Sequence, residues 1–181
     1  MKIAAVLLTV LVFLTSCSTV RFNITDEKRI NLFPLVSEAN KTETFLLVTG
    51  SFPSIGELTA QAWLETDNSG LSLTVMLPTG QTLMQIYYNG KKTTVSPSSA
   101  KTVMFAPYVV ADVQLCFTPS AVIEENLAAN GLRYEETQEN EDITRCIYDG
   151  DKLVICVKIH QNVFQVKNIL RGYEYTAEIL Y

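Results

Sequence analysis

Few side chains in this 181-residue sequence are of the types that enzymes use for catalysis, and those few are poorly placed for it. His160 is the single histidine, which excludes a multi-histidine metal site and leaves any base at this position without an evident partner. Glu124-Glu125 and Glu135-Glu136 are adjacent carboxylates, and neighbours on a helix or strand point in different directions. The sequence contains no G-x-S-x-G, H-E-x-x-H, P-loop or Cys-x-x-Cys motif. We therefore expect no enzymatic activity, no metal and no cofactor.

The N-terminus carries the clearest chemical signal. Lys2 precedes the apolar run Ile3–Leu14, which is too short to span a membrane and has the form of a secretory signal. The run ends in Leu14-Thr15-Ser16-Cys17, which resembles the bacterial lipoprotein box, in which a cysteine is lipidated and becomes the new N-terminus. The resemblance implies removal of residues 1–16 and attachment of acyl chains such as palmitate to Cys17. The alternative is a plain signal peptide with an incidental cysteine.

The residue after Cys17 bears on the destination of the chain. In lipoproteins that stay in the inner membrane this position is Asp, whereas here it is Ser18. The resemblance therefore implies a lipid anchor in the periplasmic face of the outer membrane of a Gram-negative bacterium. Several acyl chains on one residue would hold the protein there stably.

Composition limits the remaining function classes. The formal net charge of −5 argues against a nucleic-acid partner, which would require a basic stripe. Hydrophobic residues make up 48% of the chain, which is enough for a packed core in one domain.

Three thiols follow Cys17, and an oxidising compartment permits one disulfide among them. Cys146 and Cys156 flank the hairpin turn at Asp149-Gly150, but a regular cross-strand register would not place them opposite each other. The pair therefore stays open as either a bridge or two thiols. We expect Cys116 to be a small core hydrophobe.

Residues 17–41 are predicted to form the lipidated N-terminus and a tether, because polar residues dominate them. The apolar island Ile30–Val36, interrupted by Pro34, could pack on the body. Residues 42–181 are predicted to form a single domain.

Alternation of apolar and polar residues predicts strands over most of this domain. It is clearest in Glu57–Thr66 and recurs at Leu71–Leu77. Short turn sequences such as Asn89-Gly90 separate these segments, so Phe45–Val95 is predicted to be a meander of four or five antiparallel strands. Five further strand segments follow Gly131: Leu132–Thr137, Ile143–Tyr148, Leu153–Ile159, Val163–Ile169 and Tyr173–Leu180.

Between the two sets of strands the apolar spacing becomes helical. We predict a loop at Ser96–Ala100 and helices at Tyr108–Cys116 and Ser120–Ala129, with a sharp joint at Thr118-Pro119. The expected fold is mainly β (α+β): a curved antiparallel sheet or incomplete β-barrel of around nine strands, with two short helices inserted mid-chain.

Three segments resemble a small family of bacterial lipoproteins encoded beside aryl polyene pigment-lipid genes. They are Leu77-Pro78-Thr79-Gly80-Gln81, Val110-Ala111-Asp112-Val113-Gln114-Leu115 with Pro119, and Asn168-Ile169-Leu170-Arg171-Gly172-Tyr173. That family is similar to the LolA and LolB lipoprotein carriers, which implies a half-barrel that holds acyl chains under its helices. The sequence departs from the family at Phe117-Thr118, where an aromatic pair usually precedes the proline.

The apolar face of such a sheet would bind a hydrophobic chain if its own side chains left space. The alternative is that the same residues form an ordinary filled core. The candidate lining residues are Leu58, Ala60, Ala62, Leu64, Leu73, Val75, Ile86, Tyr173, Tyr175 and Ala177.

Three polar residues are further candidates for binding. Asp112 and Gln114 lie on an otherwise apolar helix, where they would either bind a ligand headgroup or hydrogen-bond a neighbouring loop. Arg171 precedes Gly172 in a predicted turn and could contact a lipid phosphate.

These observations favour an outer-membrane lipoprotein that binds an acyl or polyene chain and assists lipid or lipoprotein localisation. The expected partners are acyl chains and the membrane, with a periplasmic protein as a further candidate. The alternative is a membrane-tethered adaptor with a filled core and no ligand.

Overall fold

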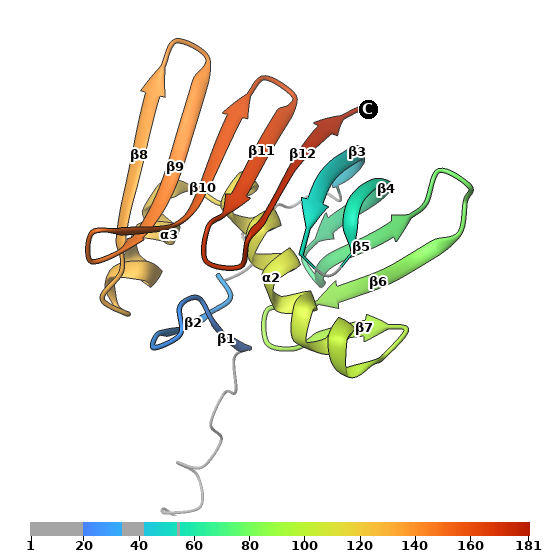
Figure 1. The fold of residues 1–181 in the computed structure, drawn as a ribbon, viewed down its shortest axis with the longest axis horizontal. Coiled ribbons are helices and arrows are strands. Elements are labelled where there is room, and N and C mark those ends of the chain that lie inside the picture. The colour runs from blue at the N-terminus through green and yellow to red at the C-terminus, as the bar shows by residue number, and fades with distance from the viewer. Residues whose placement is uncertain (1–19, 34–41, 54) are drawn as a thin grey trace, which may run out of the picture.

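One antiparallel sheet of ten strands dominates the computed structural model, which describes residues 20–33, 42–53 and 55–181 (Figure 1). The strand order is β7-β6-β5-β4-β3-β12-β11-β10-β9-β8, so β7 and β8 are edges and the sheet does not close into a barrel. The mainly β class and the open antiparallel sheet predicted from the sequence are confirmed. The predicted signal peptide and Cys17 lie outside the described residues.

Two meanders of five strands make up this sheet. Within each meander successive strands pair with each other, and β12 pairs with β3 to join the two meanders. The first meander comprises β3 (Thr42–Phe52), β4 (Gly56–Asp67), β5 (Gly70–Met76), β6 (Thr82–Tyr88) and β7 (Thr93–Ser96). The second comprises β8 (Arg133–Glu139), β9 (Asp142–Asp149), β10 (Lys152–His160), β11 (Val163–Asn168) and β12 (Tyr173–Ile179).

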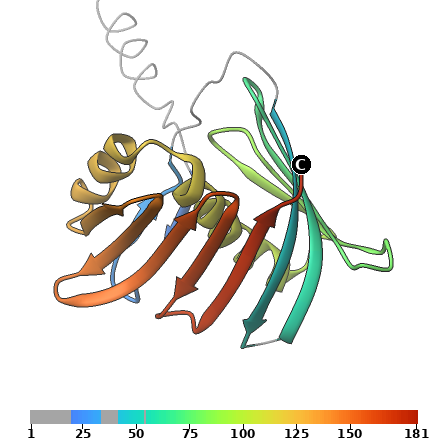
Figure 2. The ribbon, with the colours of Figure 1, turned by 90° about the horizontal axis from the view of Figure 1, so that it is seen from above.

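Both helices lie on the concave side of the sheet, as Figure 2 shows. They are α2 (Ala100–Phe117) and α3 (Ser120–Ala128), and the break between them is at the predicted joint. The predicted start of the first helix at Tyr108 is wrong, because the helix begins eight residues earlier and continues through Pro107. Ser99, expected in a loop, caps this end in a capping box with Thr102.

Arg145 on β9 fixes the other end of α2. Its Nη1 donates hydrogen bonds to the carbonyl oxygens of Leu115 (2.7 Å) and Thr118 (3.0 Å), and its Nε pairs with Glu136. A cation at the C-terminus of a helix satisfies carbonyl groups that have no partner within the helix and opposes the negative end of the helix dipole. This contact sets where α2 ends over the sheet.

An N-terminal hairpin also packs on the concave side. Its strands are β1 (Arg21–Asn23) and β2 (Arg29–Asn31), and its apolar side chains are buried together with those of α2. The ring of Phe22 meets that of Tyr108 edge to face, with centroids 5.1 Å apart. Residues 20–33 belong to the segment predicted as lipidated N-terminus and tether, and they form this packed hairpin. The described part of the apolar island packs on the body, as the sequence allowed.

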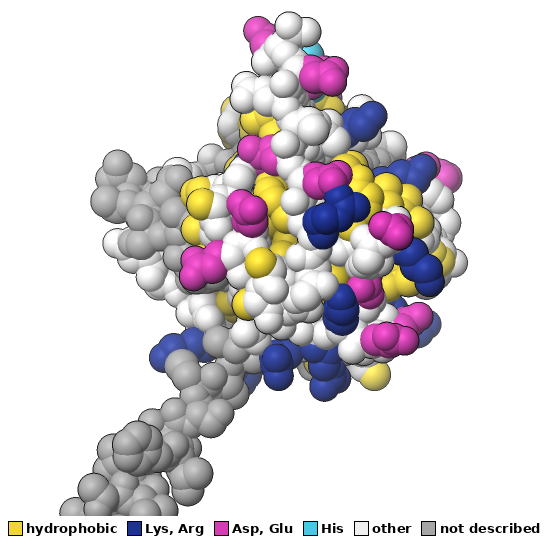
Figure 3. Space-filling model, turned by 90° about the vertical axis from the view of Figure 1, so that its left-hand side faces the viewer, with side chains coloured by type: hydrophobic (Ala, Val, Ile, Leu, Met, Phe, Trp, Pro, Cys, Tyr) yellow, Lys and Arg dark blue, Asp and Glu magenta, His cyan; other side chains and the backbone are white. Residues whose placement is uncertain are grey.

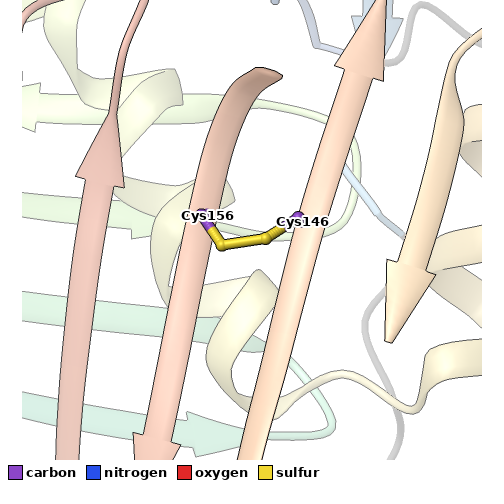
Figure 4. Close-up of a disulfide and its surroundings, with 2 residues drawn as sticks. All are labelled: Cys146 and Cys156. Atoms are coloured by element: carbon purple, nitrogen blue, oxygen red, sulfur yellow. A yellow bond between two sulfur atoms is a disulfide. The ribbon is translucent and has the colours of Figure 1, made fainter. Parts of the chain in front are cut away.

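A disulfide joins Cys146 on β9 to Cys156 on β10, with Cα atoms 4.2 Å apart (Figure 4). The register runs regularly from the turn to Leu153 opposite Tyr148 and then shifts by one residue at a β-bulge before Ile155. The shift places Cys156 directly opposite Cys146. The regular register expected from the sequence was wrong, because a bulge inserts one extra residue into one strand.

Replacing Cys146 and Cys156 together by serine should lower the free energy of unfolding by about 2–3 kcal/mol, because the bond closes a loop of sequence separation 10 in the unfolded chain. Guanidinium chloride unfolding with and without reductant measures this change. Reductant should destabilise the natural sequence and leave the double variant unaffected. Equal stability of the two proteins under oxidising conditions would contradict the expectation.

Candidate functional site

A cavity of about 110 Å³ lies between α2 and the concave face of the sheet. The sheet contributes apolar residues of β3, β4, β5, β6, β11 and β12, and α2 contributes one stripe along its length. The lining residues are Leu46, Val48, Phe52, Ile55, Leu58, Ala60, Ala62, Leu73, Val75, Met84, Phe105, Val109, Asp112, Val113, Cys116, Phe117, Phe164, Tyr175 and Ala177.

The cavity is long and narrow, and it reaches the surface. Its α2 lining extends from Phe105 to Phe117, which corresponds to about 18 Å of helix at the usual rise per residue. Two lining residues are exposed, Ile55 at 63% and Phe117 at 46%. The ring of Phe117 lies 4.9 Å from that of Phe164 on β11. The two exposed residues therefore lie where the cavity opens to the surface.

Small residues explain why this space is empty. Ala60 and Ala62 on β4 and Ala177 on β12 face α2, and none of them reaches the helix surface with more than a methyl group. Gly50 on β3 lies opposite Tyr175, and a Cβ at this glycine would come within 2.3 Å of the Cβ of that tyrosine. The absence of a side chain at Gly50 lets Tyr175 lie against β3.

Most of the lining predicted from the sequence does face this cavity. Leu58, Ala60, Ala62, Leu73, Val75, Tyr175 and Ala177 line it. Leu64, Ile86 and Tyr173 do not; they are buried in the core beside it. Alternation along a strand fixes the face of a side chain but not its position relative to the helix, so these three could not be separated from the rest.

The lining that sequence reasoning missed lies on α2. Phe105, Val109, Val113 and Cys116 recur at three- and four-residue spacing, which places them on one face of the helix. Phe105 falls before the predicted start of the helix at Tyr108, and the apolar lining predicted from the sequence comprised strand residues alone. Burial raises the pKa of the Cys116 thiol, so this free cysteine stays protonated and unreactive in the cavity wall.

Asp112 is the charged residue of the lining, and its side chain is buried at 3% exposure. The hydroxyl groups of Tyr173 (2.8 Å) and Tyr175 (3.3 Å) donate to its Oδ2, and Asn168 Nδ2 donates to the Tyr173 oxygen. Burial raises the pKa of Asp112 to about 7, although the two tyrosine hydrogen bonds oppose this shift. The carboxyl group therefore exchanges protons near neutral pH.

Gln114 faces away from the cavity and has a structural role. Its Oε1 accepts a hydrogen bond from the backbone N–H of Phe33 (3.0 Å), and its Nε2 donates to the Phe33 carbonyl (2.7 Å). The hydroxyl of Tyr88 donates to the same carbonyl. Of the two interpretations that the sequence left open for Gln114, the structure supports hydrogen bonding to a neighbouring segment.

Arg171 also lies outside the cavity lining. Its Nη2 donates to the carbonyl of Asn23 (2.9 Å), and its guanidinium lies 5.1 Å from the centre of the Tyr108 ring. These contacts tie the turn between β11 and β12 to the N-terminal hairpin.

His160 lies at the far end of β10, on the convex face, where it pairs with Asp142 and its side chain is 58% exposed. Among the described residues, no group of three or more His, Cys, Asp or Glu side chains is arranged to hold a metal ion. Acidic and basic side chains are interspersed over the end of the molecule that carries β8, and no basic stripe is visible on that face (Figure 3).

The fold and cavity define a β-sheet protein with an apolar pocket covered by a helix. Residues 47–179 match the family model described as "Protein of unknown function (DUF3261)", and the chain belongs to this family. A comparison with curated proteins finds no match. Among solved structures, the crystal structure of the LolA superfamily protein NE2245 from Nitrosomonas europaea is similar at 5% sequence identity, covering 82% of this chain and 87% of that chain with a TM-score of 0.42.

Neither helix in the described part of the chain combines the length and the hydropathy needed to cross a membrane.

Titration of Asp112 should make stability depend on pH. Between about pH 4 and pH 7 the folded protein keeps a proton on Asp112 that the unfolded chain releases, so the free energy of unfolding falls as the pH rises through this window. Asp112→Asn cannot titrate and lacks this contribution. As the pH rises from 4 to 7, the free energy of unfolding of the variant should therefore increase by up to a few kcal/mol relative to that of the natural sequence, at about 1.4 kcal/mol per unit of pKa difference.

Denaturant unfolding of both proteins at several pH values from 4 to 8 measures this difference. Groups common to the two proteins cancel in the comparison. Parallel stability curves across this range would show that Asp112 has the same pKa in the folded and unfolded protein, against the expectation.

Proposed function

We propose that the protein binds a single apolar chain, such as an acyl or polyene chain, in the cavity under α2 and assists the localisation of a lipid or lipoprotein. The observation that carries this proposal is the apolar cavity itself, with exposed apolar residues at Ile55 and Phe117. Burial of the chain would supply the binding free energy, at about 0.8 kcal/mol per methylene. This function requires no covalent chemistry and no cofactor.

The size of the cavity limits how much of a ligand it can hold. Pockets for drug-sized ligands have volumes of roughly 300–1,000 Å³, whereas this cavity has about 110 Å³. It therefore suits the end of one chain rather than a whole lipid. The rest of the ligand would extend past Ile55 or Phe117, or α2 would move away from the sheet to admit more of it.

Membrane attachment through Cys17 completes the proposal. The lipoprotein-like sequence Leu14-Thr15-Ser16-Cys17 and the following Ser18 support an anchor in the periplasmic face of the outer membrane. The resemblance of three segments together, at Leu77–Gln81, Val110–Leu115 and Asn168–Tyr173, to lipoproteins encoded beside aryl polyene genes supports an aryl polyene lipid as the cargo.

Cys17→Ser should remove the site of acylation and abolish labelling of the protein by radioactive palmitate. Ser16→Ala keeps a small residue before the cysteine and should behave like the natural sequence. A Cys17→Ser protein that still takes up the label would refute the proposed anchor.

A second candidate function is that of a tethered adaptor, and one feature of the convex face favours it. Phe45, Trp63 and Tyr181 form an aromatic cluster there, with the Phe45 ring 5.9 Å from Trp63 and 5.2 Å from Tyr181. Tyr181 is largely exposed. Such a cluster could contact another protein, independently of any ligand in the cavity.

Filling the cavity separates these two functions. Ala60→Phe places a ring inside the cavity and should weaken the binding of a fluorescent acyl probe at least tenfold, because the probe would lose the burial of about two methylenes. Thr59→Phe is the matched control, since it adds the same ring to the exposed side of the same strand. Fluorescence titration measures both affinities, and circular dichroism checks that each variant is folded.

Equal affinity of the Ala60→Phe, Thr59→Phe and natural proteins would refute binding in this cavity. Absence of probe binding to the natural sequence would favour the adaptor.

A further inference from the structure

Only one of the two oxygens of the Asp112 carboxyl group accepts a hydrogen bond from a described residue. Both tyrosine hydroxyls donate to Oδ2, and no described residue donates to Oδ1. Oδ1 is not among the fully buried side-chain atoms that lack a partner in the described part of the chain, so it borders open space rather than packed atoms. One acceptor in the wall of an otherwise apolar cavity is therefore available to a ligand.

The surroundings of Asp112 limit which ligand group would suit this acceptor. The neighbouring lining residues Val109, Val113 and Cys116 offer no charge, and a cationic amine would lose its hydration on entering such a cavity. A hydroxyl group is neutral and both donates and accepts hydrogen bonds. Since burial raises the pKa of Asp112 to about 7, both of its protonation states occur near neutral pH, and a hydroxyl can pair with either.

We propose that Asp112 is a specificity residue through which the cavity prefers an apolar chain that bears a hydroxyl group over a plain hydrocarbon chain. The second oxygen of its carboxyl group is the acceptor, and the tyrosine hydrogen bonds on Oδ2 hold the carboxyl group in place. This inference rests on the proposed function, since it requires that a chain enters the cavity.

A competing partner for Oδ1 is a single buried water. Asp112 also borders a second cavity of about 20 Å³, on the side of the N-terminal hairpin, which Asn168 lines as well. This space is large enough for one water molecule. A water bound there would satisfy Oδ1 without any ligand, and the cavity would then show no preference for a hydroxyl group.

Competition against a fluorescent acyl probe tests the inference on the full chain with Cys17→Ser. Two matched pairs of competitors place the hydroxyl group at different depths: hexadecanoic acid with 16-hydroxyhexadecanoic acid, and octadecanoic acid with 12-hydroxyoctadecanoic acid. At least one hydroxylated chain should bind about tenfold more tightly than its parent, in keeping with a hydrogen bond to a carboxyl group.

Variants assign this preference to Asp112. Asp112→Leu should abolish it while retaining binding of the parent chains, and Asp112→Asn, which keeps an acceptor oxygen, should preserve it. Thr59→Phe is a control, because Thr59 is exposed on β4 and does not line the cavity. It should also preserve the preference.

The outcomes distinguish failure of the role of Asp112 from failure of the proposed binding function. Equal binding of parent and hydroxylated chains by the natural sequence, or an unchanged preference in Asp112→Leu, would overturn the role of Asp112 and leave the binding function intact. Failure of every chain to bind would refute the proposed function and the inference with it.

Discussion

The placement of α2 is the constraint on which the rest of this structure depends. The helix is apolar over most of its circumference, and a helix of this kind is stable only when it is covered on several sides. The concave sheet covers one side, and the hairpin of β1 and β2 covers another. The two polar residues Asp112 and Gln114 are two positions apart and so point in nearly opposite directions. Asp112 meets Tyr173 and Tyr175 of the sheet, whereas Gln114 meets the backbone that follows the hairpin.

Space for a ligand follows from this arrangement and from residue size. Arg145 on β9 ties the end of α2 to the sheet, and Gln114 ties the helix to the backbone of Phe33 after the N-terminal hairpin. The alanines on the facing strands do not fill the gap that remains. The side chains that line an empty cavity lack van der Waals contacts on one side, and a bound apolar chain would supply these contacts. The same reasoning explains why a single small-to-large substitution at Ala60 is an informative change.

The strands were predictable because alternation and turn residues are local signals. The meander over Phe45–Val95 and the antiparallel class both follow from them. The bulge that aligns Cys146 with Cys156 was not predictable, because it depends on how Val154 and Ile155 are both buried against the concave side. Packing of the apolar island was anticipated, but the hairpin of β1 and β2 was not, because its polar composition resembles a linker and its few apolar residues are buried only through contact with the rest of the fold.

For the site, the sequence identified the correct face but not the walls of the cavity. Tyr173 and Tyr175 lie on the same face of β12 and both stack on Phe52, yet only Tyr175 lines the cavity. The ring of Tyr173 also meets that of Phe105 edge to face. The functions of Asp112 and Gln114 could not be separated from their spacing alone. To distinguish the two roles, one must know which neighbouring segment each side of α2 contacts.

The most direct test of the central claim is native mass spectrometry of the full chain with Cys17→Ser, purified from a Gram-negative host without added lipid. If the space beneath α2 holds an apolar chain, part of the protein should carry a non-covalent lipid adduct that added fatty acid displaces. Protein that is consistently free of adduct and takes up no fatty acid would contradict the claim.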